Sequence, residues 1–163
     1  MLTKTFLSIL ILVLTVLIII GACATTSKTK EEKEGVNQEI FFQSVRSGDY
    51  DEVKRLIGIG VDVNAQDNFG ETALMKASYY EHQEIAQLLI ENGADVSAQT
   101  NEGLTALFFV TDRGNLELAI LLIENGADVN IQNNFGETAI TYALTEEHPE
   151  IAKLLREAGA KYY

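Results

Sequence analysis

The residues of this chain that could carry out chemistry are few, and their spacing does not bring them together. The two histidines, His82 and His148, lie two periods of a 33-residue repeat apart. A metal needs ligands that converge at one point, so we interpret both histidines as structural. The glycines follow the same repeat and do not group as in a phosphate-binding loop. The sequence therefore indicates no enzyme, no catalytic residue, no metal site, no cofactor and no small-molecule substrate.

The elements that position these residues are set by the 33-residue repeat. Two short segments return with this period: GETAL at 70–74 as GLTAL at 103–107 and GETAI at 136–140, and NGADV at 92–96 unchanged at 125–129 and degraded to AGA at 158–160. A fixed period between about 20 and 50 residues indicates a solenoid, in which each unit buries its apolar face against its neighbours. This architecture favours binding over catalysis.

The unit at residues 67–99 shows how each repeat is built. A turn over 67–70 leads to Thr72, whose hydroxyl is placed to cap a first helix. After a short break, a second helix is predicted over 83–91, with apolar residues at i, i+3 and i+4 on one face. Gly93 then supplies the left-handed residue that ends this helix. Each unit is therefore predicted to be helix, turn, helix and capped loop.

These motifs resemble the ankyrin repeat, whose unit has a G-x-T-P-L-H start to its first helix and a G-A-D-V-N loop after its second. The resemblance is close over 67–163 and weaker before residue 67. It implies an all-α solenoid of stacked helix-turn-helix units with short hairpin-like loops. The predicted ankyrin repeat domain is 36–163, with an N-terminal capping repeat, two full repeats and a C-terminal repeat at 36–66, 67–99, 100–132 and 133–163.

The chain departs from the family motif because every Pro and His of T-P-L-H is replaced. The corresponding segments read TALM at 72–75, TALF at 105–108 and TAIT at 138–141. We expect Met75 and Phe108 to fill the space of the missing His by apolar packing. Glu81 and Glu147 stand where the family has Gly between the two helices. A left-handed backbone at each Glu would cost on the order of 1 kcal/mol.

The N-terminal residues are predicted to form a targeting signal. Lys4 precedes an apolar run over 6–20, in the order of regions found in a signal peptide. Ile-Gly-Ala-Cys at 20–23 resembles the bacterial lipoprotein box, and Cys23 is the only cysteine in the chain. The resemblance implies cleavage of a lipoprotein signal peptide at 1–22 and lipidation of Cys23. Two or more acyl chains on this residue would hold the protein stably on a bilayer.

Two alternatives to the lipoprotein interpretation stay open, namely an uncleaved signal anchor over 5–22 and a chance cysteine. For an uncleaved anchor, the lysines that follow the apolar run would favour a cytoplasmic repeat domain. Cleavage makes that count less relevant, and export remains the prediction. Residues 23–35 are then the lipidated Cys and a flexible tether. The predicted location is the bacterial cell envelope, as a lipid-anchored protein of the outer membrane that faces the periplasm or the surface.

The net charge of −12 limits the class of partner. Nucleic-acid binding depends on Lys and Arg against phosphate, so this charge argues against a nucleic-acid partner. It equally argues against a polybasic contact with a membrane surface. The acidic excess is interpreted as a device for solubility or, alternatively, as an attraction for a basic partner.

Candidate partner-binding positions are those that packing leaves free, namely the turn tips at 68–69, 101–102 and 134–135 and the ends of the first helices. By resemblance to ankyrin domains, they line a concave partner groove. Tyr and Arg are enriched among binding hot spots, because each offers a large area with a polar group. The alternatives are that a tip Phe packs on the next turn and that the Tyr pair packs on the next repeat. The candidate residues are Phe69, Tyr79, Tyr80, Asp112, Arg113 and Phe135.

The sequence therefore predicts a membrane-tethered adaptor. It would bind an unidentified extracytoplasmic protein through its concave ankyrin surface and contact the lipid bilayer through acylated Cys23. The alternative is a dedicated inhibitor, immunity factor or protective partner of one envelope enzyme. Purification of the chain from envelope extract together with what it binds would separate the two.

Overall fold

The computed structural model describes residues 35–161 of the chain. The predicted signal peptide, Cys23 and the tether up to residue 34 lie outside the described residues. The chain divides into two compact units, Met1–Asn37 and Gln38–Tyr163, and the second unit holds the repeats. Helical structure already includes residue 35, one position before the predicted start of the first repeat.

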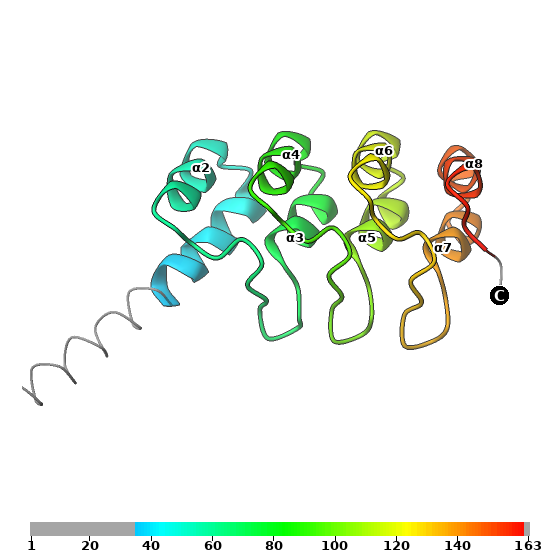
Figure 1. The fold of residues 1–163 in the computed structure, drawn as a ribbon, viewed down its shortest axis with the longest axis horizontal. Coiled ribbons are helices and arrows are strands. Elements are labelled where there is room, and N and C mark those ends of the chain that lie inside the picture. The colour runs from blue at the N-terminus through cyan, green and yellow to red at the C-terminus, as the bar shows by residue number, and fades with distance from the viewer. Residues whose placement is uncertain (1–34, 162–163) are drawn as a thin grey trace, which may run out of the picture. The chain divides into compact units, whose positions relative to one another are not determined.

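The second unit consists of four helix pairs, one for each repeat, which follow one another along the chain (Figure 1). The first pair joins the helical residues 38–47 to α2 (Tyr50–Gly58). The other pairs are α3 (Ala73–Tyr79) with α4 (Gln83–Glu91), α5 (Ala106–Arg113) with α6 (Leu116–Glu124), and α7 (Ala139–Thr145) with α8 (Pro149–Glu157). Residues 35–161 contain no strand. The predicted all-α solenoid of helix-turn-helix units is confirmed.

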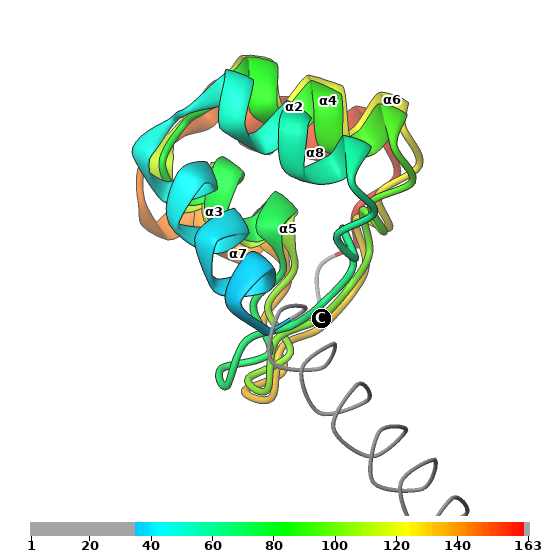
Figure 2. The same ribbon diagram turned by 90° about the vertical axis from the view of Figure 1, so that its left-hand side faces the viewer.

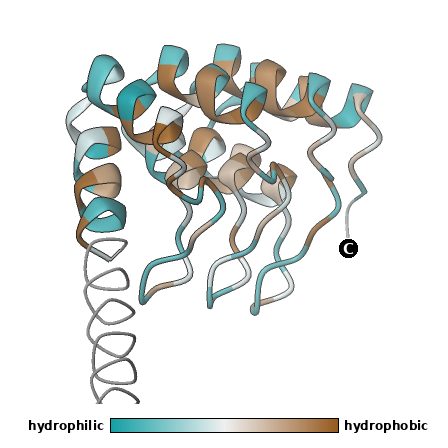
Figure 3. Cartoon of the chain, turned by 60° about the vertical axis from the view of Figure 1, so that its left-hand side comes forward, coloured by the Kyte–Doolittle hydropathy of each residue, from teal (hydrophilic) through white to brown (hydrophobic). Residues whose placement is uncertain are grey.

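The helices form two layers, with the first helix of each pair in one and the second in the other (Figure 2). In the first layer α3 packs on α5 and α5 on α7, and in the second α4 packs on α2 and α6, and α6 on α8. Hydrophobic residues concentrate on the helices, whereas the projecting loops are largely hydrophilic (Figure 3). One continuous core runs between the layers, and its fully buried large side chains include Phe41, Leu74, Leu89, Leu107, Leu122, Ile140 and Leu155.

Three repeats have different residues where the family motif has His, at the start of the first helix. Each of these residues takes the place of the His in a different way. Thr72 is the predicted N-cap, and its Oγ1 accepts the Met75 N–H at 3.3 Å. Met75 is buried, as expected, and its Sδ also accepts the Thr72 N–H at 3.4 Å. In the last repeat Thr141 Oγ1 lies 3.5 Å from the Thr138 nitrogen. Phe108 has no such acceptor, and its ring packs edge-on against a neighbouring tyrosine instead.

Neighbouring repeats meet at the turn between the paired helices. His82 Nε2 lies 3.1 Å from the carbonyl oxygen of Arg46 in the preceding repeat. A Cβ at Gly48 would lie 2.7 Å from the His82 ring, so this histidine requires a glycine opposite it. Glu81 occupies the glycine position of the next turn with φ of +61°, and there the opposing residue is Asn115, which donates to Glu81 Oε2 at 3.3 Å. The histidine thus has a structural role.

The projecting loops are joined by a ladder of asparagines. Asn101 Nδ2 donates to the Asn68 carbonyl at 3.0 Å, and Asn134 Nδ2 donates to the Asn101 carbonyl at the same distance. The backbone N–H of Asn101 also donates to the Phe69 carbonyl at 3.0 Å. The side chains of Asn101 and Asn134, the first tip residues of the third and fourth repeats, are therefore part of the scaffold. The prediction that both tip residues are free is corrected on this point.

Candidate partner-binding groove

The turn that opens each repeat projects one side chain into solvent. In the second repeat, Asp67 Oδ1 accepts the N–H groups of Phe69 at 2.9 Å and Glu71 at 3.0 Å, which closes the turn and turns the Phe69 ring outward. Phe69 is 72% exposed, and Phe135 at the equivalent tip of the last repeat is 79% exposed. Neither ring is buried on the next turn, so the packing alternative does not account for these residues.

The two tyrosines at the end of α3 border a neighbouring repeat and remain half exposed. The Tyr79 ring stands edge-on to Phe109 with centroids 6.1 Å apart, and the guanidinium carbon of Arg113 lies 4.0 Å from the Tyr79 ring centre. Tyr80 stands edge-on to Tyr79 at 5.1 Å and stacks on His82. Tyr79 therefore packs on the third repeat and still exposes 38% of its surface, while Tyr80 exposes 46%.

Two hollows lie along this face of the repeats. One, of about 310 Å³, lies beside Tyr79 and Tyr80, and the other, of about 240 Å³, lies beside Phe69 and Leu104. Both are lined by Glu71 and Phe109, so the hollows are neighbours on one face. We call this surface the aromatic groove and define it by Phe69, Tyr79, Tyr80, Leu104 and Phe109.

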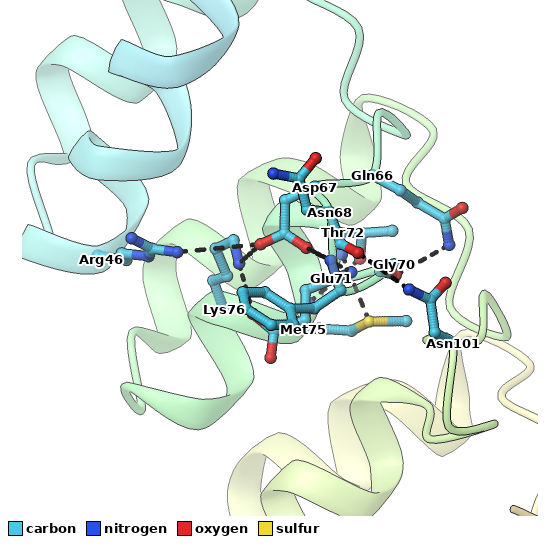
Figure 4. Close-up of polar contacts among 11 residues, drawn as sticks. Arg46, Gln66, Asp67, Asn68, Gly70, Glu71, Thr72, Met75, Lys76 and Asn101 are labelled. Atoms are coloured by element: carbon cyan, nitrogen blue, oxygen red, sulfur yellow. Dashed lines mark hydrogen bonds and ion pairs between the residues drawn. The ribbon is translucent and has the colours of Figure 1, made fainter. Parts of the chain in front are cut away.

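A buried cluster of charges forms one end of the groove (Figure 4). Lys76 is only 2% exposed, and its Nζ lies 2.5 Å from both Asp67 Oδ2 and Glu71 Oε2. The Nζ also lies 5.3 Å from the centre of the Phe42 ring, and Arg46 approaches Asp67 at 3.9 Å. The positive charge of Lys76 is thus shared between two carboxylates and is not available to a partner.

The pKa of Asp67 is set by two opposing causes. Burial alone would raise it, but the Lys76 ammonium and the N–H groups of Glu71 and Phe69 stabilise the carboxylate, so the pKa lies below its ordinary value. Asp67 therefore remains ionised and paired in the folded protein. The cluster is a structural ion pair with no free nucleophile or base.

The structure brings together most of the residues predicted to bind a partner. Tyr79 contacts both Tyr80 and Arg113 at the groove, and Phe69 lines its other end. Asp112 is exposed, and within the described residues its carboxylate makes no ion pair. Phe135 stands on the last tip, and in the part of the chain that the structure describes it makes no ring contact with the groove residues.

The sequence interpretation missed Phe109, which is shared by both hollows. Phe109 occupies the same repeat position as Lys76 and Tyr142, at steps of 33 residues. A comparison of the repeats at this position would have shown Lys, Phe and Tyr on one face. The signal was present in the sequence, but the comparison of the repeats covered only the tips and the ends of the first helices.

Two further features bear on what residues 35–161 can do. No group of three or more His, Cys, Asp or Glu among them could hold a metal ion. Among the same residues, none of the helices has the length and apolar composition that a membrane crossing requires. The groove offers apolar contact area, hydroxyl groups and a few charges, which suit the recognition of another molecule.

Comparison with known proteins agrees with the fold. The profile of the family described as ankyrin repeats (3 copies) matches residues 15–100, 41–133 and 92–163, so the chain belongs to the ankyrin repeat family. Ankyrin repeats generally mediate protein–protein interaction and are typically not enzymes.

Two relatives match over short stretches. The chain is 42% identical over 55 residues to the ankyrin repeat-containing protein YIL001W of Saccharomyces cerevisiae, which is 34% of this chain and 11% of that protein. It is 37% identical over 51 residues to a protein of Escherichia coli strain K12 named as an ankyrin repeat protein, YahD, which is 31% of this chain and 25% of that protein. The matches span at most a quarter of either relative, so they support the repeat and not a shared function.

Proposed function

We propose that this chain is a membrane-tethered adaptor that binds an extracytoplasmic protein through the aromatic groove. The observation that carries the binding proposal is the groove itself, where Tyr79, Tyr80 and Phe69 keep large exposed surfaces on a rigid scaffold. Large aromatic side chains with a polar group are typical binding hot spots, because they bury much area at a low cost in conformational entropy.

The tethering part of the proposal is supported by the sequence before the described residues. The apolar run over 6–20 and the segment 20–23 ending in Cys23 resemble a lipoprotein signal. Lipidation of Cys23 would hold the repeats near a bilayer while leaving the groove free. Adaptor function requires both properties, because a tether without a binding face recruits nothing.

Tethering is tested by labelling cells with a fatty-acid probe. The wild-type chain is expected to carry the probe and to migrate as the cleaved form, whereas Cys23→Ala is expected to remain an unlabelled precursor. Equal labelling of the two would contradict the lipoprotein proposal. This outcome would leave the binding proposal untouched.

Binding is tested by affinity purification from envelope extract, with mass spectrometry. The wild-type chain is compared with the double variant Tyr79→Ala/Tyr80→Ala and with Tyr50→Ala, an aromatic of α2 outside the groove. A partner is expected to be retained by the wild type and by Tyr50→Ala and lost by the double variant. A set of captured proteins that is the same for all three chains would refute the groove as the binding surface. An enzyme as the partner would favour an inhibitor or immunity role.

A further inference from the structure

The aromatic groove is built for side chains of a polypeptide and not for a small molecule. Its two hollows, of about 310 and 240 Å³, lie at or below the lower limit of about 300 Å³ for small-molecule sites. They follow one another along α3, α5 and the tips, which matches successive side chains of an extended segment. Residues 35–161 offer no strand whose edge could pair with a peptide backbone. Recognition would therefore depend on side chains.

The positive charges near the groove are already engaged. Lys76 is buried between two carboxylates, and Arg113 stacks on the Tyr79 ring. Arg46 approaches Asp67. An acidic partner segment would therefore have to compete with contacts that the protein already makes.

The negative charges at the other end of the groove are not engaged in the same way. Glu102 lines the smaller hollow, and neither it nor Asp112 forms an ion pair within the described residues. Burial raises the pKa of the Tyr142 hydroxyl, and the charges of Glu137, Asp112 and Glu102 raise it further, so all three make the potential at this hydroxyl more negative. The wider domain has the same sign, since residues 36–163 hold 21 Asp and Glu against eight Lys and Arg.

We propose that the aromatic groove binds an extended basic segment of the partner protein. In this arrangement a large apolar side chain of the segment packs on Phe109 between the two hollows. A Lys or Arg side chain beside it reaches Glu102, which lines the smaller hollow. This inference rests on the proposed function and adds the chemistry of the partner to it.

Selection from a random-sequence peptide library on the immobilised full chain tests the inference. The selected peptides are expected to be enriched in Lys and Arg next to aromatic or large aliphatic residues. Their affinity is expected to fall with added salt, since rim charges at an interface are screened. Selected peptides that are acidic, or that bind as tightly to Phe69→Ala as to the wild type, would overturn the inference. Failure to select any groove-dependent peptide would also overturn it.

Charge reversal in the groove provides a matched comparison for the same peptides. Glu102→Lys is expected to weaken their binding about tenfold at low salt. Glu124→Lys makes the same change on the exposed end of α6, in the other helix layer, and is expected to leave binding unchanged. If both variants weakened binding equally, the net charge of the protein and not the position of Glu102 would account for the effect. This result would contradict the inference.

The outcomes separate this inference from the proposed function. If the chain captures an envelope partner that depends on Tyr79 and Tyr80, but Glu102→Lys does not alter that capture, the adaptor function stands and the basic segment falls. If no capture depends on the tyrosines, while basic peptides still bind in a Glu102-dependent way, the peptide chemistry stands and the adaptor function falls.

Discussion

The second and fourth repeats close the same turn with different residues. In the second, Asp67 Oδ1 accepts the N–H groups two and four residues later, at 2.9 and 3.0 Å. In the fourth, Asn133 Oδ1 accepts the two equivalent N–H groups, both at 3.0 Å. Thr100 Oγ1 does the same in the third repeat, at 3.2 and 3.1 Å. The turn therefore requires an acceptor oxygen, and its charge is free to vary.

The residue nine positions after this acceptor also differs between the repeats, and it lies on the same face as the groove. In the second repeat that residue is Lys76, which pairs with Asp67. In the fourth it is Tyr142, and Asn133 Nδ2 instead donates to Glu137 Oε2 at 2.9 Å. The second repeat is thus closed by ion pairs, whereas in the fourth the Glu137 carboxylate has no cation among residues 35–161. One scaffold can hold different charges at equivalent positions of two repeats.

Removal of the lysine is expected to have the largest effect on stability. Lys76→Ala leaves Asp67 and Glu71 facing each other without their shared cation in a largely buried place. We expect the free energy of unfolding to fall by about 3 kcal/mol, the lower limit for breaking a buried ion pair, because both carboxylates keep some exposure. Urea denaturation followed by circular dichroism measures it.

The fourth repeat suggests a variant that sharpens this prediction. Asp67→Asn combined with Lys76→Tyr installs the residues of Asn133 and Tyr142 in the second repeat. It is expected to be more stable than Lys76→Ala, because only Glu71 loses its cation and the amide introduced at position 67 can donate to it, as Asn133 donates to Glu137. A double variant that is less stable than the single one would show that the two turns are not interchangeable.

Acid is expected to distinguish the two turns as well. The pKa of Asp67 is lowered in the folded protein, so its contribution is full above the ordinary aspartate pKa of 3.8 and is lost as the pH falls through the lowered value. The stability of the wild type is therefore expected to decrease more steeply below about pH 4 than that of Asp67→Asn/Lys76→Tyr. The Glu52–Arg55 pair, which also lowers a carboxylate pKa, is common to both proteins and cancels. Parallel pH profiles would contradict the assignment.

A third difference between the repeats concerns Ser78, the residue before the last one of α3. Its hydroxyl is buried and has no hydrogen-bond partner within the described residues, whereas Thr111 at the same position donates to the Leu107 carbonyl at 2.7 Å. Burial of an unpaired hydroxyl is unfavourable. We expect Ser78→Ala to stabilise the protein by about 1 kcal/mol, measured by thermal unfolding. A loss of stability would indicate that the hydroxyl has a partner.

The smallest effect is expected at the hydroxyl of the fourth repeat. Tyr142→Phe keeps the ring that packs edge-on against Phe108, with centroids 5.2 Å apart, and removes only the hydroxyl. The hydroxyl forms a hydrogen bond with the Asn133 side chain. The loss is expected to be about 0.5 kcal/mol, within the range for one neutral hydrogen bond near solvent. A decrease as large as that of Lys76→Ala would show that the fourth turn depends on its inner residue as much as the second does.

Much of the fold could be predicted from the sequence, because it depends on local and periodic signals. The N-cap at Thr72, the second helix from Gln83 to Glu91 and the left-handed residue at Gly93 all follow from residue types at fixed positions. Glu81 and Glu147 stand where the family has Gly, and both have the left-handed backbone whose cost was considered from the sequence, with φ of +61° and +58°.

The groove was only partly predictable, because it depends on contacts between repeats. Tyr79 could be assigned to an exposed helix end, but its packing against Phe109 and Arg113 joins residues about 30 positions apart. The asparagine ladder of the tips was hidden for the same reason, since Asn68 and Asn101 are ordinary turn residues when each is considered alone. Side-chain partners across a repeat boundary are not encoded in either repeat alone.

The central claim is that the aromatic groove is a binding surface, and one purified variant tests it. On Tyr79→Ala/Tyr80→Ala, the affinity for the captured partner and the melting temperature are measured together. We expect an affinity about thirtyfold weaker, which corresponds to about 2 kcal/mol. We also expect a small decrease in melting temperature from the lost contact of Tyr79 with Phe109. A lower melting temperature with unchanged affinity would contradict the account, because the tyrosines would then serve packing alone.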